Sequence, residues 1–201
     1  MFPRKPPTPQ YRSRDRQRGV AALEFALVAV IFFTLFFGVL ELARAMYICN
    51  TLQEVTRRAA AMAVNTDFSD ATAMQQLRNR AVFRDSPGTL LLGDPVSDQH
   101  IKIDYLQIPA GAAIPVSISG ALPASPRENR VNCAINPNAG NCIQLVRVRI
   151  CAPDGASGTC APVAYKTLVS LIALAFPLPP STTIARVETL GLAPGTPCPC
   201  T

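Results

Sequence analysis

An apolar run close to the N-terminus constrains this chain more than any other feature. About sixteen almost wholly apolar residues, Phe25 to Leu40, follow a short basic leader. Counted from Val20, the apolar segment is 21 residues long, which as a helix is roughly 31 Å and spans the ~30 Å hydrocarbon core of a bilayer. The sequence therefore predicts one transmembrane helix over residues 20–40.

The charge of the chain is concentrated in the leader. Of the formal net charge of +6, residues 1–19 carry +5, whereas the other 182 residues carry only +1. This distribution does not predict a surface for nucleic acid. It predicts a cytoplasmic N-terminus in contact with anionic lipid, with residues from about 45 onward on the other side of the membrane. The prolines and clustered arginines of residues 1–18 predict a disordered leader. The six cations of the leader are Arg4, Lys5, Arg12, Arg14, Arg16 and Arg18.

A lone carboxylate, Glu24, lies at the head of the apolar run, five residues after Gly19. A charge there opposes insertion, by up to ~2.5–3.5 kcal/mol at the bilayer centre and by less near its edge. Either this side chain reaches back to headgroup water from one turn inside the membrane, or it pairs with another charge.

Beyond the span, the pattern predicts that the same helix continues to about residue 64. No proline or glycine interrupts it after Val39, and apolar or small residues recur every three or four positions. Such an amphipathic half needs a partner, either the protein's own sheet or a neighbouring chain. Ser69 or Asp70 can cap a second helix that reaches about Phe83. The predicted stripe consists of Leu42, Ala45, Cys49, Leu52, Val55, Ala59 and Met62.

The rest of the chain predicts loops and short strands, and hence an α+β fold with a small, mostly antiparallel sheet. Strands are expected over 101–105, more weakly over 113–118, most clearly over 142–151, and over 184–190. Residues 168–176 are ambiguous between helix and strand. The predicted organisation is a leader (1–19), a transmembrane helix (20–40), an amphipathic helical stalk (41–84) and an exported β-rich, cysteine-containing domain with a Pro-rich tail (85–201).

Six of the seven cysteines lie in the part that the predicted topology exports, where disulfides persist. Cys133, Cys142, Cys151 and Cys160 are spaced nine apart. A strand over 142–151 would be roughly 30 Å long, so its two ends could not pair. The simplest scheme joins Cys133 to Cys142 and Cys151 to Cys160; the crossed scheme, 133–151 with 142–160, is less local. Cys198 and Cys200 are further disulfide candidates, within the chain or between chains.

Catalytic and metal-binding patterns are missing from the sequence. The spacing of the cysteines is not that of a zinc site, and no phosphate-binding loop, H-E-x-x-H or G-x-S-x-G occurs. The single histidine, His100, is expected at the surface, and Cys49 is expected to be a small core residue. We expect no enzymatic activity, no cofactor and no metal.

The order basic-Gly-Val-Ala-Ala-Leu-Glu-Phe before an apolar helix resembles a prepilin processing site. The variant Glu-Phe-Ala-Leu-Val at residues 24–28 resembles the TadE-like pseudopilins of the tight-adherence (Flp) pilus machinery. The resemblance continues through Gly-x-x-Glu-x-x-Arg at residues 38–44 and Thr-Arg-Arg-Ala-Ala-Ala at residues 56–61.

This resemblance implies that a prepilin peptidase cuts after Gly19, which makes Val20 the new N-terminus and places Glu24 fifth and Phe25 sixth. The glutamate would then pair with the new α-amino group of a neighbouring subunit. The resemblance also implies a single-pass inner-membrane protein with a periplasmic C-terminal domain, and other pilins, pseudopilins and secretion-system subunits as partners.

Two alternatives remain open at the level of the sequence. One is a bitopic or exported, disulfide-stapled binding module without a role in a pilus. The other is a signal peptidase site at Ala43-Arg44-Ala45, which would release a soluble domain that starts at Met46. The length of the apolar run and the helical pattern across the cut argue against that release.

Overall fold

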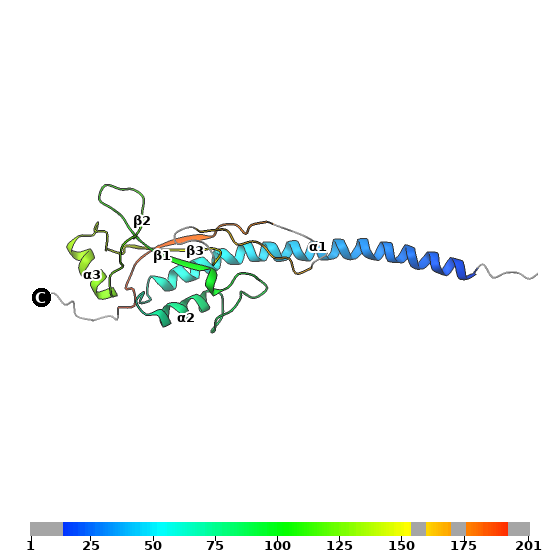
Figure 1. Cartoon of the computed structure of the whole chain (residues 1–201), viewed down its shortest axis with the longest axis horizontal. Helices are drawn as coiled ribbons and strands as arrows, with labels where there is room; N and C mark the ends of the chain where they lie inside the picture. The colour runs from blue at the N-terminus through cyan, green and yellow to red at the C-terminus, as the bar shows by residue number, and fades with distance from the viewer. Residues whose placement is uncertain (1–13, 154–159, 170–175, 193–201) are drawn as a thin grey trace, which may run out of the picture.

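The structure is a computed structural model, and it describes residues 14–153, 160–169 and 176–192. It confirms the α+β class, with a long N-terminal helix, shorter helices and one antiparallel sheet (Figure 1). The elements in chain order are α1 (Arg14–Ala63), α2 (Ala71–Ala81), η1 (Asp98–His100), β1 (Ile101–Gln107), β2 (Val116–Ser117), α3 (Pro126–Ile135), β3 (Leu145–Ile150) and β4 (Thr182–Arg186).

Helix α1 is continuous over 50 residues, and its N-terminal half projects alone from the rest of the molecule (Figure 1). It ends within one residue of the predicted boundary, but it begins at Arg14, inside the leader. The expectation of a fully disordered leader is therefore wrong at residues 14–18. Arginine and glutamine are good helix formers, and extending an existing helix adds a hydrogen bond for each residue fixed.

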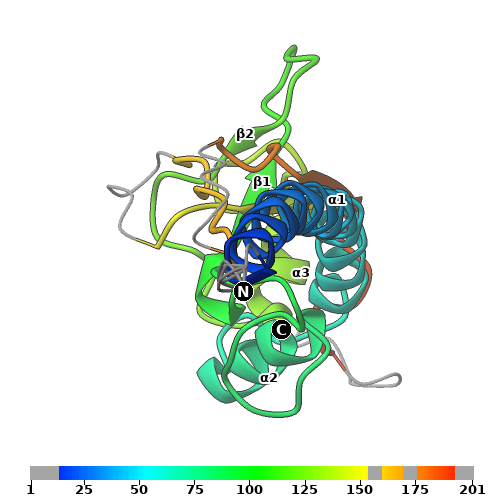
Figure 2. The same ribbon diagram turned by 90° about the vertical axis from the view of Figure 1, so that its right-hand side faces the viewer.

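The C-terminal half of α1 packs on the protein's own sheet and on α2 (Figure 2). The partner of its amphipathic stripe is therefore the protein's own sheet and not a neighbouring chain. Most of the predicted stripe is buried, but Leu42 is 59% exposed and Cys49 and Met62 are only partly buried. The stripe drifts around the helix because 3.6 residues make one turn, so that Ile48 and Ala63 replace these positions. The buried apolar residues of α1 are Ala45, Ile48, Leu52, Val55, Ala59, Ala60 and Ala63.

The sheet has the order β2-β1-β3-β4, and all of its neighbours are antiparallel. In β3 the predicted alternation is confirmed: Val146 and Val148 are buried, while Arg147 and Arg149 both bind the carboxylate of Asp104 on β1. The weak strand shrinks to two residues in β2, and the last strand begins two residues before its predicted start. Of the ambiguous segment 168–176, residues 170–175 lie outside the described part of the chain.

Buried hydroxyl groups fix α1 against β4. Thr56 is 1% exposed, and its hydroxyl lies 2.9 Å from that of Ser181 and 3.0 Å from that of Thr183. Ser181 also donates to the carbonyl of Leu52 on α1 (3.1 Å). Because each of these groups has a partner, the polar contacts set the position of the helix without leaving a desolvated hydroxyl unpaired.

Helix α2 begins as predicted, with Asp70 as its N-cap. The carboxylate accepts from the backbone N–H groups of Thr72 (2.8 Å) and Ala73 (3.1 Å), which have no partner inside the helix. Met74 and Leu77 of this helix are buried in the core that α1 and the sheet form.

Helix α3 was not predicted, although the sequence contains its start signal. Ser125 caps the helix by accepting from the N–H of Glu128 (3.2 Å), and Pro126 occupies the first turn. A serine cap with glutamate three residues later and proline at the first helical position is a recognised signal for the start of a helix. The buried side chain of Asn129 holds α3 in place, because it bonds both the N–H and the carbonyl of Ile143.

Two disulfides follow the local scheme and exclude the crossed one. Cys133 is joined to Cys142, and Cys151 to Cys160, each with a Cα–Cα distance of 4.9 Å. Cys142 and Cys151 flank β3, which explains why they cannot join each other. Cys49 is a free, partly buried thiol. Cys198 and Cys200 lie outside the described residues.

The packing predicts a large effect of Leu52→Ala, because Leu52 is fully buried between α1 and the sheet. We expect this substitution to lower the free energy of unfolding by about 2–5 kcal/mol. The adjacent, exposed Gln53→Ala should change it by less than about 0.5 kcal/mol. Urea unfolding of the full chain in detergent, followed by tyrosine fluorescence, measures both; equal effects would contradict this core.

Candidate functional site

The four residues expected to direct processing and assembly all lie exposed on the projecting part of α1. Val20 is 56% and Phe25 74% exposed, and Gly19 and Glu24 are exposed as well. Among the described residues, Glu24 has no hydrogen bond or ion pair. Helix α1 is long and apolar enough to cross a membrane, and no residue of its most apolar 18-residue stretch is buried inside the protein. Such a surface has to be covered by lipid or by other helices.

The glycine at position 19 has no structural explanation. A Cβ atom placed there would meet nothing within 4 Å, and Gly19 lies within α1 rather than at a turn. A glycine inside a helix costs roughly 1 kcal/mol relative to alanine. The fold would therefore accept alanine at this position.

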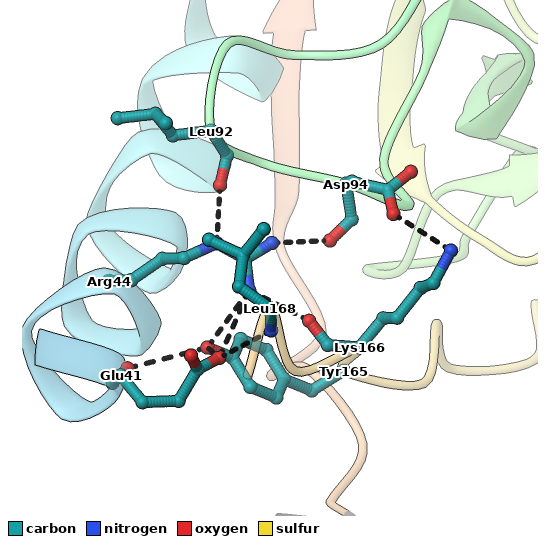
Figure 3. A network of polar contacts seen from close by, with 7 residues as sticks. All are labelled: Glu41, Arg44, Leu92, Asp94, Tyr165, Lys166 and Leu168. Atoms are coloured by element: carbon teal, nitrogen blue, oxygen red, sulfur yellow. Dashed lines mark hydrogen bonds and ion pairs between the residues drawn. The ribbon is translucent and has the colours of Figure 1, made fainter. Parts of the chain in front are cut away.

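At the end of the apolar segment, α1 is joined to the rest of the molecule by Glu41 and Arg44, which we call the junction pair (Figure 3). Their side chains are only 3% and 8% exposed, and they form an ion pair of 3.1 Å, one helical turn apart. The hydroxyl of Tyr165 donates to the Glu41 carboxylate (2.5 Å), and the N–H of Leu168 donates to the same oxygen (3.2 Å).

The Arg44 guanidinium binds two loops at once. Its Nε donates to the carbonyl of Leu92 (2.8 Å), and its two terminal nitrogens donate to the carbonyls of Asp94 (2.9 Å) and Lys166 (2.7 Å). The group also lies over the ring of Tyr165, 5.3 Å from its centre. A planar fork with five N–H donors suits this set of acceptors, which point at it from different directions.

The surroundings of Glu41 favour its ionised form. Burial by itself raises the pKa of this carboxyl group, but the hydrogen bonds from Tyr165, the Leu168 N–H and Arg44 outweigh burial and lower the pKa. For Tyr165, burial and the neighbouring carboxylate raise the pKa. At neutral pH the junction therefore contains a carboxylate, a guanidinium and a neutral phenol. Each of these three groups is a hydrogen-bond partner of the other two.

Sequence reasoning identified the Glu-x-x-Arg spacing but not the role of these two residues. An acid and a base three residues apart on a helix can pair, and that signal was available. Their other partners could not be inferred, because Leu92 and Tyr165 lie 48 and 121 positions away from Arg44.

The expected surface position of His100 is wrong. This residue is 8% exposed, and its Nδ1 accepts the N–H of Ser97 (3.0 Å). The loop before η1 is tied to Asp98 of the same short helix, whose carboxylate accepts from the N–H of Gly88 (3.0 Å). Within the described residues, no group of three or more His, Cys, Asp or Glu side chains could hold a metal ion.

Comparison with known proteins supports the resemblance seen in the sequence. A family model described as TadE-like protein matches residues 19–61. This segment is TadE-like, and it coincides with α1 from Gly19 almost to its end, including Glu24 and the junction pair. Searches of curated proteins and of solved structures found no significant match.

Arg44→Lys tests the junction. A lysine ammonium presents its donors from one point and cannot reach carbonyls on two loops together with Glu41. We expect a loss of about 1–3 kcal/mol in the free energy of unfolding, because buried acceptors lose their partner. The exposed Arg57→Lys on the same helix is the matched control, and unfolding of the full chain in detergent measures both. Equal stability of the two variants would contradict the junction.

The lowered pKa of Glu41 predicts a dependence of stability on pH. The stabilisation from its ionised form is complete above the ordinary pKa of 4.5 and is lost as the pH falls through the lower pKa of the folded state. Wild type should therefore be more stable than Glu41→Gln at neutral pH, and the difference should shrink in acid. A difference that stays constant with pH would show that the charge of Glu41 does not matter.

Proposed function

We propose that the protein is a minor pseudopilin of a tight-adherence (Flp-type) pilus or a related secretion system, and that a prepilin peptidase processes it after Gly19. The TadE-like segment indicates involvement in such a pilus system. The observation that carries the proposal is the projecting half of α1, an apolar helix whose surface is exposed and whose carboxylate, Glu24, has no partner among the described residues.

A partner for Glu24 would come from another subunit. Cleavage after Gly19 creates an α-amino group at Val20, which is largely cationic at neutral pH. Opposite charges attract strongly in a low dielectric, whereas an unpaired carboxylate there is costly. When subunits stack, pairing of this amine with the Glu24 of a neighbour would therefore favour one register over others.

The unexplained glycine supports processing at this position. Since a side chain at Gly19 would meet nothing, packing does not require glycine at this position. A peptidase that recognises glycine before the cut would require it.

The junction pair supports retention of the apolar helix. Cleavage after Ala45 would separate Glu41 and Arg44 from the domain. It would leave buried Tyr165 without its carboxylate partner, and the carbonyls of two loops without a donor. The release of a soluble domain that starts at Met46 is therefore the less favourable alternative.

Glu24→Ala should leave membrane insertion intact and abolish assembly, because it removes one charge of the pair and makes the helix more apolar. The control is Glu54→Ala, which removes an exposed carboxylate from the other half of the same helix. Cell fractionation measures insertion, and electron microscopy of surface pili measures assembly. Normal pili in the Glu24→Ala strain would refute the assembly role.

Gly19→Ala should accumulate the unprocessed chain without a loss of stability, because alanine fits the helix at this position. Gly120→Ala makes the same substitution at another site where a Cβ meets nothing and should be processed normally. Immunoblotting of membranes distinguishes the two lengths. Normal processing of the Gly19→Ala chain would contradict the assigned cut.

A further inference from the structure

Large apolar side chains are exposed at the end of the domain that faces the projecting helix. Leu91 is 67%, Leu92 62% and Leu168 65% exposed. They come from two segments far apart in the sequence, which lie on either side of Arg44 (Figure 3). We call these three residues the leucine cluster.

The contacts of the cluster fix its position along α1. The carbonyl of Leu92 accepts from Arg44, that of Leu91 accepts from the hydroxyl of Tyr47 (3.3 Å), and the N–H of Leu168 donates to Glu41. Since a helix rises 1.5 Å per residue, Arg44 lies about 6 Å beyond Leu40, the end of the apolar span. The polar headgroup layer on each side of a bilayer is about 5–8 Å thick. The cluster is therefore held at the level of the headgroups.

The loop that presents two of these leucines is held in one conformation. Leu90 is buried, its N–H donates to Val96 (2.8 Å), and its carbonyl accepts from Gly93 (2.9 Å). Leu92, at the tip of this turn, has a φ of 55°, a left-handed conformation that is uncommon for any residue except glycine. An apolar side chain kept exposed at such a position points to an external contact.

We propose that the leucine cluster inserts into the interfacial layer of the bilayer that α1 crosses, so that the exported domain lies against the membrane. The apolar surface of α1 continues toward the cluster through Leu42 and Met46, which are 59% and 61% exposed. Tyr47 and the exposed Lys166 lie at the same level, as residues that prefer the membrane–water interface do. This inference rests on α1 crossing a membrane and not on processing or pilus assembly.

Tryptophan fluorescence tests this inference, because the chain contains no tryptophan. Leu91→Trp and Leu168→Trp each introduce a single probe at an exposed position on a different segment. Ile135→Trp is the matched control: Ile135 is 79% exposed at the end of α3, which lies at the far end of the molecule from the projecting helix (Figure 1). The full-length chains are reconstituted in vesicles of phosphatidylethanolamine and phosphatidylglycerol, with or without lipids brominated near the headgroup end of the acyl chains.

Both probes in the cluster should show blue-shifted emission and lose intensity when brominated lipid is present, whereas Ile135→Trp keeps the emission of a solvated residue. Emission like that of the control from both cluster probes would overturn the inference. So would a blue shift without quenching by bromine, because it would mean that protein and not lipid covers the leucines. The vesicles contain no peptidase or pilus component, so the result does not depend on the proposed function.

Discussion

The Arg44 guanidinium holds two loops of the domain against α1 at the end of its apolar segment. On one side is a helix whose surface is almost entirely apolar and exposed; on the other is a domain with its own core, sheet and disulfides. Arg44 lies one turn beyond the apolar span and binds the carbonyls of two loops together with the Glu41 carboxylate. Because both charges are buried and paired, neither is left desolvated without a partner. The loops of the domain are thereby fixed at the point where the apolar segment of α1 ends.

One helix thus serves two environments. Its C-terminal half buries a stripe of alanine, valine, leucine and isoleucine against β3 and β4, so it belongs to the core of the domain. Between Gly19 and Leu40 its surface is almost entirely apolar, and Glu24 is the only charged residue of this segment. A rigid, continuous α1 would transmit any register set by Glu24 to the domain. In the proposed pseudopilin, subunit packing in the membrane would therefore also fix the spacing of the exported domains.

Local patterns in the sequence were sufficient for much of the fold. The C-terminal end of α1, the cap at Asp70, the alternation in β3 and the two disulfides each depend on residues close together in the chain. Helix α3 was predictable in principle from Ser125, Pro126 and Glu128. The partners of Arg44 were missed because they lie far away in the sequence, on loops that fold back on α1. The exposure of Leu42 was missed for a local reason, because a strict repeat does not follow the 3.6-residue turn of the helix. At the candidate site, the spacing of Gly19 and Glu24 predicts processing and assembly roles that stay predictions, and the structure adds that no packing explains the glycine.

The mature N-terminus is the most direct test of the account, and mass spectrometry of protein extracted from membranes can determine it. If Glu24 has the proposed role, the chain starts at Val20, with or without a methyl group on its amine, so that a cation is available to pair with Glu24. A chain that starts at Met1 would mean a plain membrane anchor. A chain that starts at Met46 would mean a released domain without the junction pair. Either of these results would contradict the assembly role of Glu24.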